Sequence, residues 1–308
     1  MAINFHKHQS EISAYRNDKE WKSYLKGLSP SQCCDVVINR AVESKKSTRV
    51  INLAAERHWF DLERPYYNVW PSVFQMIEEV DLDVPIRCLT LPFDTMAMCF
   101  ADGTKHGLAT CLASVRKMND QRQITLSANI FLNGEIISVW RTGLVKDDES
   151  FKVFSSRESE KYGRISDGLI SEQTEDEILK LLCHLFCGVS ILSNDSTIVQ
   201  PIVLNRDLMK YKNADEATKK YLEDRAARIN GRGFSVGEKL EAELKTESTV
   251  SPHIRKPHMA LFWTGKGRIT PVLKLRRGAY VHRSEVTQVP TGFMDREPQF
   301  EKSVQETI

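Results

Sequence analysis

Two histidines and an arginine lie close together in the C-terminal part of the chain, at His253, Arg255 and His258. Two imidazoles can act as general base and general acid, and a guanidinium can stabilise the charge that develops on a phosphate under attack. The three residues are therefore candidates for a metal-independent RNA-cleaving site. Histidines in a binding surface instead hydrogen-bond to backbone or phosphate groups. We favour this second interpretation, in which none of the three is catalytic.

The segment around these residues is strongly basic. Between Ser251 and Ser284 it has eight Lys and Arg residues and three His residues, with no Asp or Glu. The whole chain has 43 basic and 41 acidic residues, so positive charge is concentrated in this segment. Such a local positive field favours phosphates or an acidic protein surface. The cations are Arg255, Lys256, Lys266, Arg268, Lys274, Arg276, Arg277 and Arg283.

The same segment is expected to fold as a β-hairpin. The apolar runs 259–263 and 269–275 suit two extended strands, and residues 264–268 between them suit a tight turn. This arrangement places Lys266 and Arg268 at the tip of the hairpin. The turn lacks the Gly-Lys-Ser/Thr ending of a Walker loop, so it is not predicted to be a P-loop.

Glycines and aromatic residues of the segment offer two further kinds of contact with RNA. Gly265 and Gly267 have no Cβ, so the backbone amides beside them can approach a phosphate closely. A tight turn alone would also explain both glycines. Phe262, Trp263 and Tyr280 can stack on bases of single-stranded RNA. On a strand these aromatic side chains can equally face the core, which we expect for Trp263.

No metal or cofactor site is predicted. His253, His258 and His282 have no carboxylate or thiolate nearby to complete a ligand set. Cys183 and Cys187 are four residues apart, but no second pair of ligands lies near them. An odd number of cysteines, mostly in apolar runs, suits reduced and buried thiols better than disulfides. The seven are Cys33, Cys34, Cys88, Cys99, Cys111, Cys183 and Cys187.

Two periodicities divide the chain before the basic segment. Residues 1–80 read as helical segments, with a helix start at Trp70-Pro71. From Ile86 to Trp140 the apolar period is close to two, and the later runs are separated by Asp-Gly, Asn-Asp and Asn-Gly pairs that favour hairpins. This part of the chain is therefore predicted to be an antiparallel meander.

An apolar run, Ile178–Leu192, follows a capping-box sequence at Thr174–Glu177 and is predicted to be the central core helix. It is too short, and too interrupted by charge, to span a bilayer. Charged residues from Asp215 to Ile229 predict an amphipathic helix. The expected fold is α+β, with a helical N-terminal part, an antiparallel sheet, a central apolar helix and a C-terminal basic β-hairpin. The expected units are a core domain at 1–204, a charged helical connector at 205–250, and the hairpin with its tail at 251–308.

Composition points to a cytoplasmic protein with no membrane partner. Apolar residues make up 41% of the chain and charged residues 27%, which is typical of a globular protein. Met1 to His8 lacks the apolar stretch of a secretory signal.

The C-terminal motif also resembles a known family. Pro252-His-Ile-Arg-x-x-His258, followed by Trp263-x-Gly-x-Gly267 and a basic strand, is similar to the C-terminal signature of a type V-A anti-CRISPR family found on phages and plasmids. The resemblance implies an inhibitor that lowers the level of a type V CRISPR effector nuclease by acting on its message during translation. The matching positions are His253, Arg255, His258, Trp263, Gly265 and Gly267.

Charge, motif and resemblance together predict an inhibitor that binds a specific nascent polypeptide, such as a type V effector nuclease or another nascent chain. The basic segment is expected to contact RNA or the ribosome. A His-dependent ribonuclease and an RNA-binding regulator without a protein target are the alternatives. The residues expected to bind RNA or a partner are His253, Arg255, Lys256, His258, Trp263, Gly265, Lys266, Gly267, Arg268, Lys274, Arg276 and Arg277.

Overall fold

Four consecutive antiparallel strands arise from the stretch with an apolar period of two. The computed structural model describes residues 4–43, 50–119, 121–132, 135–156, 170–246 and 257–276. The four strands are β2 (Thr95–Phe100), β3 (Leu108–Met118), β4 (Gln121–Leu132) and β5 (Glu135–Lys146). Each strand pairs with the next one along the chain. The predicted meander is therefore confirmed from β2 onward. Its expected first run, at Cys88–Leu91, was wrong, because the described chain forms a 3-10 helix at Ile86–Cys88 and no strand from there to Thr95.

Three short strands extend the meander into a mixed sheet with the order β5-β4-β3-β2-β1-β7-β6. β1 (Tyr66–Val69) runs parallel to both β2 and β7 (Gly233–Val236), and β6 (Val199–Pro201) pairs antiparallel with β7. Parallel neighbours need long crossover connections, so no hairpin turn joins β1 to β2 or to β7. The segment 205–250, expected to be a helical connector, thus supplies a strand to the interior of the sheet.

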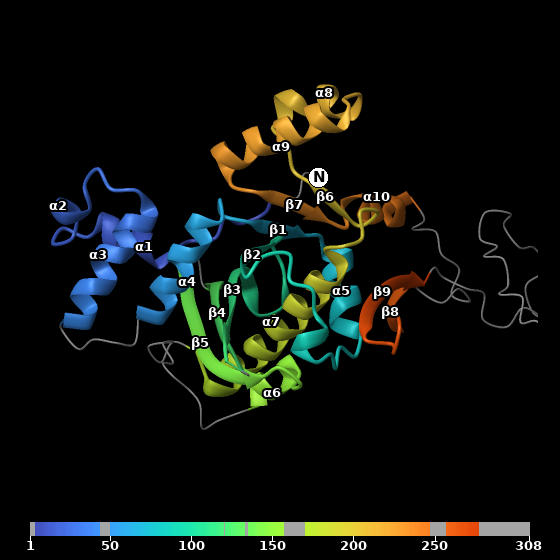
Figure 1. The fold of residues 1–308 in the computed structure, drawn as a ribbon, viewed down its shortest axis with the longest axis horizontal. Helices are drawn as coiled ribbons and strands as arrows, with labels where there is room; N and C mark the ends of the chain where they lie inside the picture. Colours follow the sequence, from blue (N-terminus) through green and yellow to red (C-terminus); the bar gives the residue numbers. More distant parts are fainter. Residues whose placement is uncertain are drawn as a thin grey trace, which may run out of the picture.

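The N-terminal helices form a layer with a small core of its own. The helices are α1 (Glu11–Asn17), α2 (Lys22–Leu25), α3 (Pro30–Glu43) and α4 (Val50–Asp61). Figure 1 shows α1, α2 and α3 to one side of the sheet. The buried residues of this layer are Ile12, Leu25, Cys33, Cys34, Val37 and Leu53. The expected helical character of this region is confirmed for the part that the structure describes.

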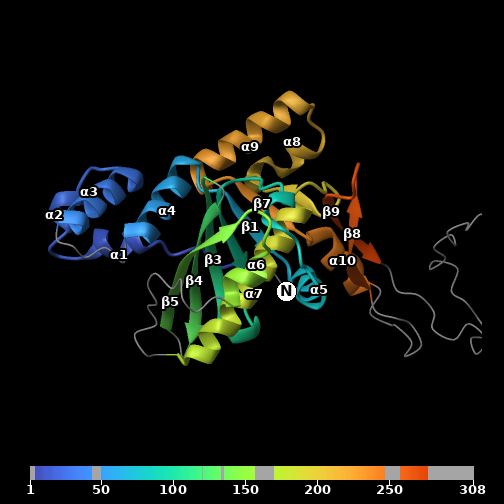
Figure 2. The same ribbon diagram turned by 60° about the horizontal axis from the view of Figure 1, so that its bottom comes forward.

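The central helix α7 (Glu172–Leu192) begins earlier than the capping box predicted. The side chain of Ser171 accepts a hydrogen bond from the backbone N–H of Thr174 at 3.2 Å, so Ser171 is the N-cap. The apolar residues after Ile178 are buried in the main core, as predicted for a central core helix. Figures 1 and 2 show α7 lying along one face of the sheet.

The remaining helices flank this core. α5 begins at Pro71 and α9 is capped by Asp215, whose side chain accepts from the N–H of Thr218 at 2.8 Å; both starts were predicted. Their bounds, with those of the other helices, are α5 (Pro71–Glu79), α6 (Phe151–Ser156), α8 (Leu208–Lys212), α9 (Glu216–Asn230) and α10 (Glu238–Thr246). Among the described residues, no helix is long and apolar enough to cross a bilayer.

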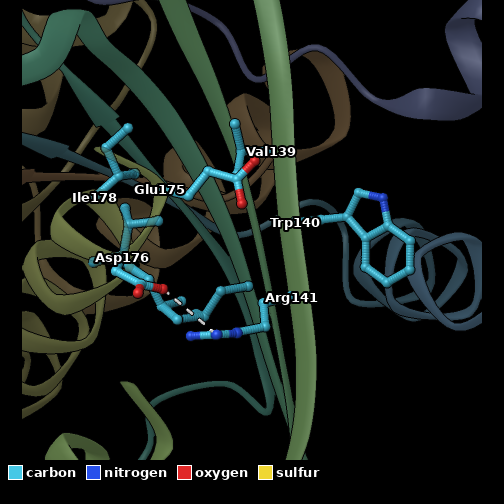
Figure 3. A pocket seen from close by; sticks show the side chains of 9 residues that line it. Val139, Trp140, Arg141, Glu175, Asp176 and Ile178 are labelled. Atoms are coloured by element: carbon cyan, nitrogen blue, oxygen red, sulfur yellow. Dashed lines mark ion pairs between the residues drawn. The ribbon is translucent and has the colours of Figure 1, made fainter. Parts of the chain in front are cut away.

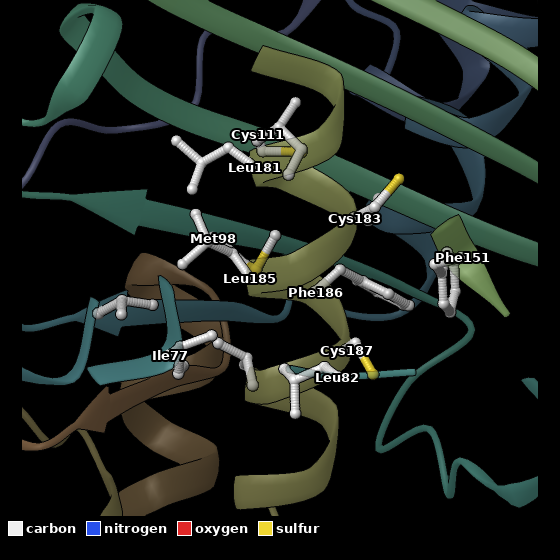
Figure 4. Packing of buried hydrophobic residues seen from close by; sticks show 14 of the residues in the cluster. Ile77, Leu82, Met98, Cys111, Phe151, Leu181, Cys183, Leu185, Phe186 and Cys187 are labelled. Carbon is white, nitrogen blue, oxygen red and sulfur yellow. The ribbon is translucent and has the colours of Figure 1, made fainter. Parts of the chain in front are cut away.

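One hydrophobic core joins α5, α7 and the inner face of the sheet (Figure 4). Leu185 and Phe186 of α7 are fully buried in it, and Phe186 makes an edge-on contact with Phe151 at 5.1 Å between ring centroids. Gly188 lets α5 approach α7, because a Cβ there would lie 2.6 Å from Ile77 Cγ2.

Helices, a mixed sheet and a separate hairpin make this an α+β fold, as predicted.

The cysteines should be protected from labelling in the native protein. Six of the seven are buried, and Cys88 is half-buried. Burial raises the pKa of Cys99 and Cys187 to about 12, so almost no reactive thiolate forms at neutral pH. A native thiol assay should therefore count Cys88 first and the other six only after unfolding. Rapid labelling of all seven in the native state would contradict this expectation.

Candidate RNA- and partner-binding hairpin

The C-terminal segment forms the predicted hairpin. β8 (His258–Thr264) and β9 (Thr270–Arg276) pair antiparallel, with His258 opposite Arg276 and Thr264 opposite Thr270. The turn closes through a 3.0 Å hydrogen bond from the backbone N–H of Arg268 to the carbonyl of Gly265. Gly265 and Gly267 both have positive φ, at 75° and 79°, which explains glycine at these positions. Lys266 and Arg268 are exposed in the turn, as predicted.

The inner face of the hairpin anchors it to the main core. Side chains on a strand alternate between faces, so Met259, Leu261 and Trp263 share the face that carries Leu273 and Leu275. Met259 and Leu273 are buried, and the other three pack against the core while remaining partly exposed. Trp263 is therefore a packing residue on this face, which is the location we expected for it. Figure 1 shows the hairpin beside α5, across the sheet from α1, α2 and α3.

The outer face of the hairpin gathers cations around an aromatic ring. His258, Phe262, Lys274 and Arg276 all lie on it, by the same alternation. The Arg276 guanidinium carbon lies 4.9 Å from the centroid of the Phe262 ring, and Lys274 Nζ lies 5.8 Å from it. These cation–π contacts hold two positive charges close together on an exposed surface. We call this surface the cationic face of the hairpin.

An open cleft of about 810 Å³ runs beside the hairpin. Trp263 and Arg268 of the hairpin line one side, and Pro85, Arg87 and Cys88 line the other. Arg87 is exposed and adds a cation that the sequence did not indicate. Arg87 and Arg268 are far apart in the chain, so only the packing of the hairpin on the body of the protein brings them to one cleft.

The structure brings together only part of the predicted site. His258, Lys274 and Arg276 share one face, whereas Lys266 and Arg268 lie at the tip, roughly 13 Å beyond Lys274 and roughly 20 Å beyond His258 along the strands. The proposed pair of catalytic imidazoles has only one member, His258, in the part of the chain that the structure describes. No group of three or more His, Cys, Asp or Glu that could hold a metal ion occurs among the described residues. The other predicted residues lie outside the described ranges, and they are His253, Arg255, Lys256, Arg277, Tyr280, His282 and Arg283.

A second pocket, between β5 and the first turns of α7, is a packing feature (Figure 3). The side chains of Arg141 and Asp176 form an ion pair there at 3.5 Å, and Arg141 is buried. The pocket has a volume of only about 20 Å³, which is room for about one water molecule. It therefore offers no space for a substrate.

Comparison with known proteins identifies the family. The AcrVA2-like model, described as the anti-CRISPR type V subtype A2 family, matches residues 67–282. Among solved structures, one titled "Crystal structure of AcrVA2" is similar at 14% identity, covering 88% of this chain and 86% of that chain with a TM-score of 0.36. No curated protein matches the chain. The family match spans more than two thirds of this chain. The chain therefore belongs to the AcrVA2-like anti-CRISPR family.

Proposed function

We propose that this chain acts against a type V CRISPR effector nuclease by binding the effector polypeptide while it is being made and lowering the amount of its message. Membership of an anti-CRISPR family supports the choice of target class. The hairpin would hold the chain near RNA or the ribosome, and the effector polypeptide would give it specificity.

The cationic face of the hairpin is the observation that carries this proposal. Lys274 and Arg276 are exposed, and the Phe262 ring positions both of them. Exposed cations on a rigid strand suit phosphate contacts, which provide affinity without reading sequence. The protein would have to meet many ribosomes and messages but inhibit the synthesis of one product. It can do so if the hairpin binds RNA without reading its sequence and recognition of the polypeptide provides the specificity.

Purified protein and cells should distinguish the inhibitor from a His-dependent ribonuclease. We expect no cleavage of a model RNA by the purified chain, with or without divalent metal, and a lower effector level in cells that express it. His258→Gln keeps the size and hydrogen bonding of the side chain but cannot transfer protons near neutral pH. This variant should keep most of the cellular effect, whereas Arg255→Ala should lose more, because a guanidinium binds phosphate through several donors.

The opposite outcome would favour the alternative. Cleavage by the purified chain that disappears in His258→Gln would identify a ribonuclease and would rule out the inhibitor proposal. Unchanged effector levels in cells that express the folded chain would also rule out the inhibitor proposal.

A further inference from the structure

A second large cleft lies far from the hairpin, between the N-terminal layer and the sheet. It has a volume of about 860 Å³, within the roughly 300–1,000 Å³ range of ligand pockets. Segment 6–11, α1 and α4 line one side, and β3, β4 and β5 line the other. The sheet residues here, such as Thr110 and Ser127, alternate with Cys111 and Ala128 of the main core, so this cleft lies on the face of the sheet opposite α7.

Amide and hydroxyl groups form the floor of the cleft. Asn129 is buried, and its side-chain nitrogen donates to the carbonyl of Gln9 at 3.0 Å and to Thr110 Oγ1 at 3.1 Å. Its side-chain oxygen accepts from Ser138 Oγ at 3.0 Å. Because a carbonyl can only accept, the contact with Gln9 fixes the orientation of the Asn129 amide. The network ties segment 6–11 to the sheet and makes one wall of the cleft rigid.

The same network assigns the proton on His8. Its Nδ1 lies 3.1 Å from Thr110 Oγ1 and 3.4 Å from the donating nitrogen of Asn129. Since Thr110 Oγ1 already accepts from Asn129, its own hydrogen is available for His8 Nδ1. His8 Nδ1 is therefore the acceptor, and Nε2 carries the proton. Burial lowers the pKa of His8 to about 4, so the ring is neutral at physiological pH. Nε2 is buried and has no hydrogen-bond partner among the described residues.

Asn52 on α4 presents the complementary group. Its side-chain nitrogen donates to Glu11 Oε2 at 2.7 Å, which leaves the side-chain oxygen as a buried acceptor without a partner among the described residues. Both atoms are buried, so they lie behind the surface of the cleft and are not exposed to a ligand in it. The exposed polar lining includes Ser138. A polypeptide main chain, with its carbonyl oxygens and N–H groups, can hydrogen-bond to such a lining.

The edge of the sheet also favours an extended polypeptide. Ile136, Ser138 and Trp140 of β5 line the cleft. β5 is the outermost strand and pairs only with β4 among the described residues. An extended peptide can add to such an edge through main-chain hydrogen bonds, with alternate side chains entering neighbouring pockets. Figure 3 shows Trp140 projecting from β5 on the side opposite Arg141, so its ring is directed away from the α7 face.

We propose that this cleft binds an extended segment of the target polypeptide, with β5 pairing with the main chain of that segment and its alternate side chains entering the cleft. This proposal rests on the proposed function, because it names the place where the effector polypeptide binds. The wall built from residues 6–17 with Asn52 and Glu56 lies outside the 67–282 family match, so nothing in that match assigns this role to it. The hairpin would then bind RNA, and the cleft would bind the polypeptide.

Site-specific cross-linking on stalled ribosomes tests the cleft directly. A photoreactive amino acid would replace Ile136, which is 38% exposed in the cleft, or Met118, which is 49% exposed at the end of β3 and does not line it. Effector message translated in vitro and stalled would supply nascent chains of known length. We expect a cross-link to the effector polypeptide from position 136 and none from position 118. Free peptide covering the cross-linked segment should compete, and oligoribonucleotide should not.

Two further variants check that the cleft itself is used. Ser138→Trp would fill the cleft from an exposed position, and Ser23→Trp makes the same change on α2, outside it. Ser138→Trp should reduce the cross-link at least tenfold and Ser23→Trp should not.

The outcomes separate the cleft from the proposed function. If the chain still captures effector polypeptide but position 136 does not cross-link, or if oligoribonucleotide competes, the cleft proposal is overturned and the proposed function stands. If no variant and no wild-type chain binds effector polypeptide, both are overturned.

Discussion

Replacing Lys274 and Arg276 together with glutamate should weaken binding to single-stranded RNA and reduce its dependence on salt. Each phosphate contact on a single strand contributes about 0.7 to the slope of log K against log salt concentration, so losing two contacts should lower the slope by about 1.4. Both side chains are exposed on the cationic face, while Met259 and Leu273 hold the hairpin to the core. The variant should therefore fold normally. Fluorescence anisotropy with a labelled oligoribonucleotide, across a salt series, measures both changes.

A matched control uses the same charge reversal elsewhere. Lys210→Glu with Lys212→Glu changes two exposed lysines at the same spacing on α8, away from the hairpin. This control changes net charge equally, so it corrects for the general effect of the field on RNA. If both double variants show the same slope and the same affinity, the hairpin does not provide the phosphate contacts.

Glu56 should make the free energy of unfolding fall between about pH 6.5 and pH 8. It is buried on α4 and accepts hydrogen bonds from the backbone N–H groups of Glu11 and Ile12, which begin α1. Burial, as the largest cause, raises its pKa from 4.5 to about 8, although the two N–H donors act in the opposite direction. The folded chain then binds more protons at this site than the unfolded chain between these values, so stability falls as pH rises.

His8 opposes this effect only at lower pH. Its folded pKa of about 4 lies below its usual 6.5, so its contribution to stability is lost as pH falls through that window. Among the described residues, Glu56 is the group whose shifted pKa governs stability between pH 6.5 and pH 8. At about 1.36 kcal/mol per pH unit, the loss from pH 6.5 to pH 8 should be about 2 kcal/mol. Chemical denaturation at the two pH values measures it.

Glu56→Gln should remove most of this pH dependence, because the amide has no proton to lose and its oxygen can still accept from α1. Glu20→Gln, at an exposed position, should leave the dependence unchanged. Equal slopes for wild type and Glu56→Gln would show that Glu56 is ionised in the folded protein at neutral pH.

The sequence predicted those elements whose signals are local. Alternating apolar residues and Asn or Gly turns were enough for β2 to β5, and one apolar run was enough for α7. β1 and β7 were missed, because four-residue parallel strands depend on neighbours far away in the chain. The start of α7 was also placed too late, since Ser171 caps it rather than Thr174.

The candidate sites, too, could be predicted only where their signals are local in the sequence. Lys274 and Arg276 could be placed on one face of a hairpin from their spacing alone. Arg87 could not be linked to Arg268, because the cleft between them exists only after the hairpin packs. The N-terminal cleft was missed entirely, because the segments that line it, residues 6–17, α4 and β3 to β5, come together only in the folded chain.

Recognition of the effector during translation is tested most directly by separating its message from its polypeptide. The chain would be expressed with three versions of an effector gene: the natural one, one recoded with synonymous codons, and one shifted in frame near its start. Recoding changes the RNA and keeps the polypeptide, whereas the frameshift keeps nearly all of the RNA and changes the polypeptide. If the chain binds the nascent effector, message levels should fall for the natural and recoded genes and stay constant for the frameshifted gene. A fall for the natural and frameshifted genes, with the recoded gene spared, would show that the chain recognises RNA sequence and would contradict the proposed function.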